Sequence, residues 1–324
     1  MEHHSTSSNH SNHSSDDHFH IFIFSHLHQK TCIVIVGPTA VGKTAFAIEA
    51  ARHFNTEIIS ADSRQCYKEL NIGVAKPSAE ELKLVPHHFI SSHSIHDTVN
   101  TAVFEQYALN QLNKIFEKND TAIVVGGTGL YVKTFCYGID EVPEVDPAVR
   151  QKIVEAYDWE GIPWLQQQLE KEDPLYFSKG DMQNPQRMMR ALEVKRSTKK
   201  SIIEFHTQPK KQRDFNIRLV GLELPKEELH TRINRRVDQM MANGLLNEVK
   251  QLRPYEKLNA LQTVGYRELF GHLKGDLELE DAVEIIKINT RQYAKRQMTW
   301  FKKDEAVRWV AANADVVTAI SNRE

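Results

Sequence analysis

Residues 31–54 read TCIVIVGPTAVGKTAFAIEAARHF. The first six are largely apolar and β-branched, which is typical of a strand buried on both faces of a parallel sheet. The apolar residues after position 44 recur at helical spacing. Between these parts, GPTAVGKT (37–44) matches G-x-x-x-x-G-K-[ST], a pattern whose backbone amides cradle phosphate oxygens at a helix N-terminus. The segment therefore predicts a strand, a phosphate-binding loop and a helix in succession.

The residues of this loop have distinct roles in holding a phosphorylated ligand. The glycines let the backbone wrap around the phosphate, Lys43 supplies a mobile cation, and the Thr44 hydroxyl is a candidate ligand for Mg²⁺. Such a loop recognises a di- or triphosphate rather than the group attached to it. The candidate diphosphate- or nucleotide-binding residues are Gly37, Pro38, Thr39, Ala40, Val41, Gly42, Lys43 and Thr44.

Further strand patterns follow the loop along the chain. They are EIIS (57–60), a possible strand at 88–90, TAIVV (121–125) and FNIRLVGLEL (215–224). Strands that alternate with helical stretches indicate an α/β fold, here a P-loop parallel sheet flanked by helices. After position 224 the pattern is helical, with one stretch that carries Gly244 inside it and a long segment at 282–303.

Between residues 141 and 213 the strand patterns disappear. The segments in this region have helical spacing and are separated by Pro and Gly, which indicates a helical insertion into the sheet domain. The catalytic core is then predicted to comprise 31–140 and 214–324. Residues 1–29 are rich in Ser, Asn and His and poor in apolar side chains, which predicts a disordered leader.

Composition excludes several classes of protein. The chain has 324 residues with a net charge of −2, so it is not a uniformly basic nucleic-acid coat. No run approaches the about 18 apolar residues that a membrane span needs, so we expect no membrane partner. The cysteines at 32, 66 and 136 form neither a disulfide framework nor a CxxC zinc pair, which indicates a reduced, cytoplasmic protein. Eight of the sixteen histidines precede residue 29, and without cysteines beside them we interpret this tract as solvated rather than metal-binding.

Asp62 is the candidate general base. It follows the strand at 57–60, and the carboxyl ends of parallel strands face the same ligand crevice as the phosphate loop. The alternative interpretation is a helix cap or turn residue. The strand at 121–125 ends in Gly126-Gly127-Thr128-Gly129 instead of the acid of a motor ATPase, which favours a small transferase.

Two groups of basic residues could bind a polyanion. There are ten Lys and Arg between 187 and 218, and six between 287 and 303 with no acid among them. Segregated charge of this kind builds a track for a nucleic acid in a chain of near-zero net charge. A solvated helix face is the alternative. Tyr293, Trp300 and Phe301 are interleaved with the second group, and their helical spacing predicts that most of them lie in the core.

Taken together, these motifs resemble the tRNA dimethylallyltransferases, also called tRNA isopentenyltransferases, of the bacterial type. The resemblance spans about residues 31–303 and rests on GPTAVGKT (37–44), SADSRQCY (60–67), NIGVAKP (71–77), PHHFI (86–90), GGTGLY (126–131), NPQRMMRALEV (184–194), RINRRVDQMMANGL (232–245), ALQTVGYRE (260–268) and TRQYAKRQMTWF (290–301). It implies transfer of a dimethylallyl group from dimethylallyl diphosphate to the exocyclic amine of the adenosine 3′ to the anticodon, in tRNAs that read codons starting with U.

The resemblance also implies roles for particular residues. The base role falls on Asp62, and Thr128 and Arg236 help the phosphate loop to hold the diphosphate. The implied cofactor is Mg²⁺, and the implied partners are the tRNA anticodon stem-loop and dimethylallyl diphosphate, with the helical insertion on the stem-loop. We expect the protein to be a monomer. The implied tRNA contacts are Asp62, Ser63, Arg64, Gln65, Thr128, Arg150, Gln186, Arg187, Met188, Met189, Arg190, Gln262, Thr263, Val264, Gly265, Tyr266 and Arg267.

Three other functions are weighed against this one. An adenylate isopentenyltransferase would share the loop and the base but would use a free nucleotide as acceptor and would need no helical insertion. A P-loop kinase or NTPase acting on RNA would turn over nucleotide and ignore prenyl diphosphate. A non-catalytic tRNA-binding module would not need Lys43, Thr44, Asp62 and Arg236 together.

Overall fold

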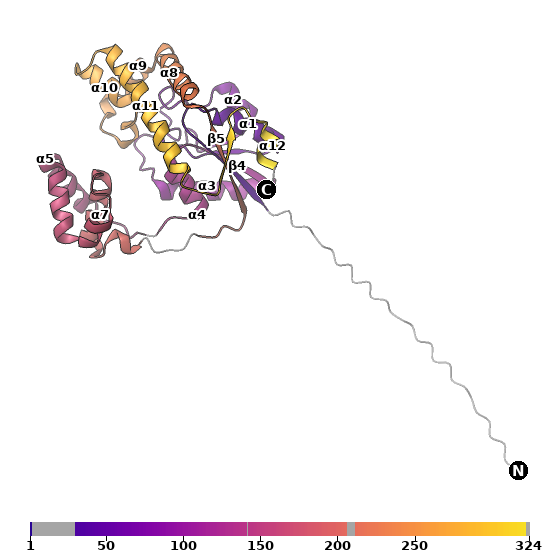
Figure 1. The fold of residues 1–324 in the computed structure, drawn as a ribbon, viewed down its shortest axis with the longest axis horizontal. Coiled ribbons are helices and arrows are strands. Elements are labelled where there is room, and N and C mark those ends of the chain that lie inside the picture. The colour runs from indigo at the N-terminus through magenta and orange to yellow at the C-terminus, as the bar shows by residue number, and fades with distance from the viewer. Residues whose placement is uncertain (2–29, 141, 206–210, 322–324) are drawn as a thin grey trace.

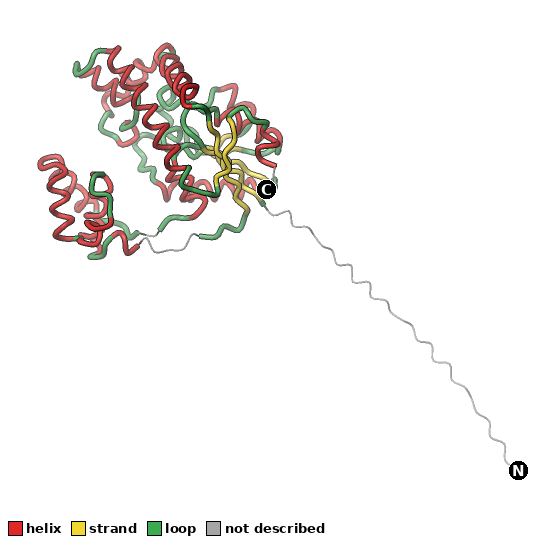
Figure 2. The backbone as a smooth tube through the Cα atoms, in the orientation of Figure 1, coloured by secondary structure: helices red, strands yellow, loops and turns green. Residues whose placement is uncertain are grey.

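The protein is built around one six-stranded sheet in which every strand pair is parallel (Figures 1 and 2). The computed structural model describes Met1 and residues 30–140, 142–205 and 211–321, so the predicted leader lies, apart from Met1, outside the described residues. The strand order is β3-β2-β4-β1-β5-β6, which confirms the predicted α/β class. The strands are β1 Thr31–Val36, β2 Ile58–Ser60, β3 His87–His88, β4 Thr121–Val125, β5 Asn216–Glu223 and β6 Val307–Ala311.

Helices cover both faces of the sheet. Alternate residues of β1 enter two different cores: Cys32 and Val34 pack with α3 and α4, whereas Ile33 and Ile35 pack with α1 and α8. This two-sided burial is why the strand is apolar without alternation. The helices are α1 Lys43–His53, α2 Ala79–Leu84, α3 Thr101–Phe116, α4 Gly129–Tyr137, α5 Pro147–Glu172, α6 Pro174–Lys179, α7 Pro185–Thr198, α8 Lys226–Ala242, α9 Leu245–Leu252, α10 Tyr266–Lys274, α11 Leu279–Phe301 and α12 Val316–Ser321.

The structure corrects three details of the sequence prediction. The stretch after residue 224 is not one helix through Gly244. Helix α8 ends at Ala242, and Gly244, whose φ is 97°, is the N-cap of the next helix, α9. The strand expected at 88–90 is the two-residue β3, His87–His88. A sixth strand, β6, was not predicted; it pairs with β5 at the edge of the sheet.

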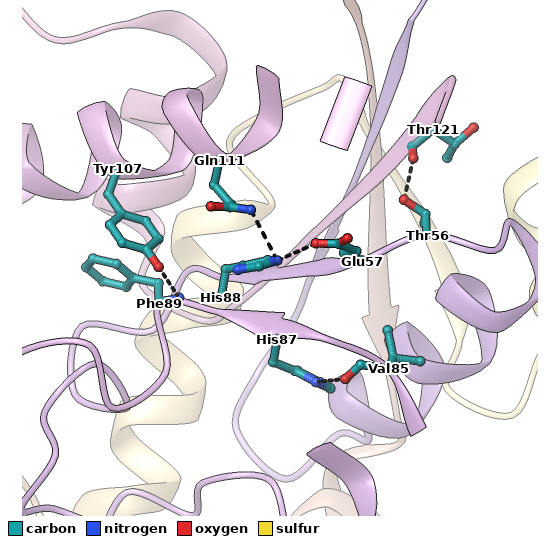
Figure 3. Close-up of polar contacts among 9 residues, drawn as sticks. All are labelled: Thr56, Glu57, Val85, His87, His88, Phe89, Tyr107, Gln111 and Thr121. Atoms are coloured by element: carbon teal, nitrogen blue, oxygen red, sulfur yellow. Dashed lines mark hydrogen bonds and ion pairs between the residues drawn. The ribbon is translucent and has the colours of Figure 1, made fainter. Parts of the chain in front are cut away.

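Strand β3 is short and is held at its edge of the sheet by side chains (Figure 3). His88 Nε2 lies 2.5 Å from the Glu57 carboxylate and 3.3 Å from the Gln111 amide of α3. On the other side of the strand, His87 Nδ1 lies 2.8 Å from the carbonyl oxygen of Val85. These contacts fix a strand that has only two backbone pairs with β2.

Helices α5, α6 and α7 pack around a core of their own. Ile153 and Leu165 of α5 meet Met188 and Leu192 of α7 there, and α5 kinks at Gly161, whose φ is 75°. Figure 1 shows α5 and α7 set apart from the sheet and from the helices that flank it. These three helices lie in the stretch for which a helical insertion was predicted. Nowhere in the described part of the chain is a helix long and apolar enough to cross a membrane.

Candidate functional site

The phosphate loop joins the centre of the sheet to the N-terminus of α1. Lys43, the first residue of α1, folds its side chain back over the loop, and its Nζ donates to the carbonyl oxygens of Gly37 (3.0 Å) and Pro38 (2.7 Å). Burial and the nearby positive charge of Arg236 lower the pKa of Lys43 to about 7, while the negative charge of Asp62 acts in the opposite direction. The ammonium group is therefore poised to respond to an anion in the loop.

Asp62 stands two residues beyond β2. Its Oδ1 atom accepts hydrogen bonds from the backbone N–H groups of Arg64 (2.8 Å) and Gln65 (3.2 Å). The turn interpretation of Asp62 is therefore correct for one oxygen of its carboxylate, and this turn fixes the direction of the side chain. The second oxygen, Oδ2, is the one available to a substrate.

Thr128 ties the turn after β4 to the turn after β2. Its hydroxyl oxygen accepts a hydrogen bond from the backbone N–H of Ser63 (3.0 Å) and lies 3.3 Å from the Ser63 hydroxyl. The Thr128 N–H in turn donates to the carbonyl oxygen of Ala61 (3.3 Å). The two turns that carry Asp62 and Thr128 are thus held as one unit.

Two cavities meet at this unit. The first, of about 760 Å³, is lined by the phosphate loop together with Gly126 and Gly127. The second, of about 340 Å³, is lined by residues 62–64, Gly73, Val74 and the segment from Gln262 to Gly265. Both cavities share Thr39, Asp62, Arg236 and Tyr293, so the carboxylate lies where they join.

Helix α8 brings a row of cations to the first cavity. Arg236 was predicted to help with the diphosphate, and Arg232 and Arg235 of the same helix line the same wall without having been singled out from the sequence. Burial lowers the pKa of Arg236 from its usual value, and the Asp62 charge opposes this shift. The phosphate end of the cavity is therefore strongly cationic.

Two residues of α11 belong to the site and were not predicted to. Gln297 is buried: its Oε1 accepts from the Thr39 N–H (2.8 Å) and its Nε2 donates to the Gly127 carbonyl oxygen (2.9 Å), which links the phosphate loop to the turn after β4. Most of the aromatic residues Tyr293, Trp300 and Phe301 were predicted to lie in the core, but Tyr293 and Trp300 are exposed and only Phe301 of the three is buried. Although part of its surface is exposed, Tyr293 lines both cavities, and the desolvation of its phenol there, together with the Asp62 charge, raises the pKa of Tyr293 to about 12, so its hydroxyl keeps its proton.

The residues assigned to tRNA by the resemblance fall into two sets. Ser63, Arg64 and the segment from Gln262 to Gly265 line the second cavity with Arg267, whereas Gln65 lines the first and donates to the carbonyl oxygen of Ala75 (3.0 Å). The other set, which comprises Arg150 and Gln186 to Arg190, lies on α5 and α7.

Three of the residues that the resemblance assigns to tRNA have buried side chains. Met188 and Met189 pack in the core of the helical region. Tyr266 is fully buried, and its hydroxyl donates to Glu248 Oε1 at 2.5 Å. The same carboxylate accepts from the N–H groups of residues 71–73, so Tyr266 and Glu248 hold the loop that forms one wall of the second cavity. These three side chains are therefore part of the packed interior in this structure, and their contact with tRNA stays a prediction.

The basic groups are partly neutralised by acids from elsewhere in the chain. Arg213 pairs with Glu105 at 2.6 Å where both are largely buried, and Arg196 pairs with Glu172 at 2.7 Å. Lys287 pairs with Asp238 at 2.8 Å. The count of cations along the sequence overstates the free positive charge, because the fold supplies the partners.

Replacing Gln297 with leucine is expected to raise about tenfold the KM for the di- or triphosphate substrate that the phosphate loop is predicted to bind. Leucine has a similar volume but leaves the Thr39 N–H and the Gly127 carbonyl unpaired, at a cost of about 1–3 kcal/mol for each buried group. Steady-state kinetics on the purified variant measure the change. Gln151→Leu, which alters an exposed glutamine of α5, is the matched control and should leave KM unchanged; equal KM values for both variants would contradict the role of Gln297.

Fold and site together define a P-loop protein of the transferase type, because a phosphate cradle opens onto a carboxylate and β4 is followed by Gly126 and Gly127 rather than by an acid. The family model "IPP transferase" matches residues 65–304. The chain belongs to this family, the tRNA dimethylallyltransferases, which transfer prenyl groups.

Individual relatives can be aligned with most of this chain. The tRNA dimethylallyltransferase of Flavobacterium johnsoniae is 48% identical over 292 residues, 88% of this chain and 94% of that protein, and the one from Christiangramia forsetii is 47% identical over 86% and 92%. Among solved structures, the tRNA isopentenylpyrophosphate transferase of Bacillus halodurans is 35% identical with a TM-score of 0.65 over 90% of this chain and 93% of that one. A eukaryotic dimethylallyltransferase acting on tRNA is 30% identical with a TM-score of 0.71 over 87% and 74%.

Proposed function

We propose that this protein transfers a dimethylallyl group from dimethylallyl diphosphate to the exocyclic amine of the adenosine 3′ to the anticodon, in tRNAs that read codons starting with U. The observation that carries the proposal is the position of Asp62 at the junction of two cavities, one lined by a phosphate loop and the other by polar and apolar groups suited to a base. Membership of a family whose members are named tRNA dimethylallyltransferases supports tRNA as the acceptor and a dimethylallyl compound as the donor.

The chemistry is a substitution at the first carbon of the prenyl group. The adenine amine forms a bond to this carbon while the bond from the carbon to the diphosphate oxygen breaks. The amine becomes acidic as it bonds, and the Asp62 carboxylate takes its proton. Lys43, the loop amides and Arg236 stabilise the charge that develops on the leaving diphosphate. This reaction requires cations at the leaving diphosphate and a base at the amine. Lys43 and Arg236 line the first cavity, and Asp62 lies where the two cavities join.

The site fits a magnesium ion bound mainly through the diphosphate. Thr44 and Asp62 both line the first cavity, and the described residues hold no group of three or more His, Cys, Asp or Glu that could hold a metal ion. Mg²⁺ commonly binds through few protein oxygens plus substrate phosphates, so the Thr44 hydroxyl is a suitable ligand. When bound, the ion would neutralise charge on the leaving diphosphate.

The acceptor base must leave its stack to reach the second cavity. Extrusion costs least in a single-stranded loop, which favours the anticodon loop over a duplex. We propose that α5 and α7 hold the stem of the same RNA. We propose that the protein acts as a monomer and that its location is the cytoplasm.

Transfer of labelled dimethylallyl from its diphosphate to two acceptors in parallel tests this function. The acceptors are an anticodon stem-loop with adenosines 3′ to the anticodon, and free AMP. Label on the RNA alone supports the proposal. Label on AMP would assign the protein to adenylate prenylation, and label on neither with nucleotide turnover would assign it to a P-loop kinase or NTPase.

Affinity for diphosphate is expected to fall as the pH rises above 7. The pKa of Lys43 is about 7 in the ligand-free protein, and an anion beside the ammonium raises this pKa, so binding above pH 7 takes up a proton. The affinity then falls by up to about tenfold per pH unit until the pKa of the complex is reached. Calorimetry with inorganic diphosphate, without Mg²⁺, measures the dependence. Diphosphate itself titrates in this range, so Lys43→Met supplies the reference; identical pH profiles for the two proteins would contradict the role of Lys43.

A further inference from the structure

A buried carboxylate lies in the helical region, away from the two cavities. Glu193 of α7 is only 2% exposed and is among the few charged residues buried in the described chain. Its neighbours along α7, Leu192 and Val194, belong to the core of the helical region. Burying a charged carboxylate is unfavourable unless it is paired and hydrogen-bonded, so the partners of Glu193 decide what it does there.

Two arginines from different helices share this carboxylate. Nη1 of Arg150, on α5, lies 2.7 Å from Oε2 of Glu193, and Nη1 of Arg190, on α7, lies 2.6 Å from Oε1. Each oxygen of the carboxylate therefore binds its own arginine. The three groups together carry a net positive charge, unlike an ordinary ion pair.

The two arginines are accessible to solvent, although Glu193, the carboxylate that anchors them, is buried. The side chain of Arg150 is 48% exposed and that of Arg190 is 40% exposed, against 3% for Glu193. Each arginine donates one Nη1 hydrogen to the anchor, and the rest of the planar guanidinium can donate elsewhere. Planar guanidinium groups suit the bidentate binding of phosphate oxygens.

We propose that Glu193 is a positioning residue that holds Arg150 and Arg190 side by side as a preformed clamp for a backbone phosphate of the acceptor RNA. This inference rests on the proposed function, because it needs the helical region to meet the RNA. Because the clamp already orders two long side chains, these side chains lose less conformational entropy when the phosphate binds. A backbone phosphate fixes the register of the RNA without reading its sequence, so the clamp orients the stem while the second cavity receives the base.

Glu193→Gln tests the inference. The amide keeps the size of the side chain but loses the charge that holds the arginines. The two arginine side chains must then be ordered when the RNA binds, so we expect the KM for the anticodon stem-loop to rise about tenfold. The KM for dimethylallyl diphosphate and the kcat at saturating RNA should not change. Unchanged KM for the RNA would overturn the inference.

A matched control and a combined variant separate positioning from folding. Glu172→Gln removes the carboxylate that binds Arg196 in the same helical region, and it should leave the KM for RNA unchanged. In an Arg150→Ala/Arg190→Ala background, adding Glu193→Gln should cause no further loss of RNA affinity, since Glu193 acts through these arginines. A further loss, or the same loss from Glu172→Gln, would mean a general structural effect and would overturn the inference.

The failure of the inference is distinguishable from failure of the proposed function. If the wild-type protein prenylates the stem-loop but Arg150→Ala/Arg190→Ala binds it as tightly as wild type, the clamp is wrong and the proposed transfer stands. If the wild-type protein prenylates no RNA, the proposed function itself is wrong, and the clamp is overturned with it.

Discussion

Replacing Asp62 with alanine is expected to lower the kcat of prenyl transfer by about 10²–10⁴-fold, the usual contribution of a positioned general base. The carboxylate lies at the junction of the two cavities and takes the proton that the adenine amine loses. Alanine removes the acceptor of this proton while the phosphate loop remains intact. Single-turnover transfer to the anticodon stem-loop measures the chemical step, and equilibrium binding of inorganic diphosphate should be preserved.

The asparagine variant separates catalysis from turn formation. Asp62 Oδ1 accepts two backbone N–H bonds, and the amide oxygen of asparagine can accept them equally well. The amide that replaces the carboxylate cannot take up a proton, so Asp62→Asn should be nearly as slow as Asp62→Ala. Near-full activity of Asp62→Asn would show that the residue only shapes the turn. Asp97→Ala is the matched control, because Asp97 Oδ2 accepts from the Ser94 N–H in an exposed turn that lines neither cavity.

The centre of the fold could be predicted because its signals are local. A strand buried on both faces leaves an apolar run, as in β1 and β4, and the glycines and lysine of the phosphate loop are contiguous. Strand β6 was missed because it lies at the edge: of its five residues only Val307 is buried, and Arg308 interrupts its apolar residues, so it lacks the continuous buried run of β1. Its place in the sheet is set by pairing with β5, which the sequence does not display.

The site could be predicted only where a motif is continuous. Asp62 is found because it lies just two residues beyond a strand, whereas Gln297 contacts Thr39 across 258 positions of sequence. One signal was present: Gln297 lies between Ala294 and Phe301 on the buried stripe of α11, where a polar residue needs a partner. The ion pairs show the same limit, since Arg213 meets Glu105 across 108 positions and no local count of charge reveals it.

Replacing Gly126 with alanine is expected to lower kcat by about 10²-fold, the loss that a displacement of about 1 Å in a catalytic group can cause. A Cβ atom on Gly126 would lie 2.2 Å from the carbonyl oxygen of Ala61, which is backbone and cannot swing aside. Ala61 directly precedes Asp62, and its carbonyl oxygen also accepts the Thr128 N–H. The added methyl group must therefore push apart the two turns that carry the base and Thr128, so the absence of a side chain at the end of β4 is a requirement of the geometry. Transfer kinetics and circular dichroism together measure whether activity falls while the fold is kept.

Gly271→Ala is the matched control, because the same substitution is made there at a glycine where a Cβ atom has space. Gly271 lies within α10, and a Cβ there would lie 3.5 Å from the side chain of Leu277, an ordinary van der Waals contact. Alanine is favoured over glycine inside a helix by about 1 kcal/mol, so this variant should be as active as wild type and slightly more stable. Full activity of Gly126→Ala would mean that Ala61 can move without displacing Asp62, and the two turns would then not be a rigid unit. Of the two glycines, only Gly126 is packed against the backbone that positions the base. A loss of activity in both variants would therefore contradict the explanation by displacement of Asp62 and would point to a general effect of the added methyl group.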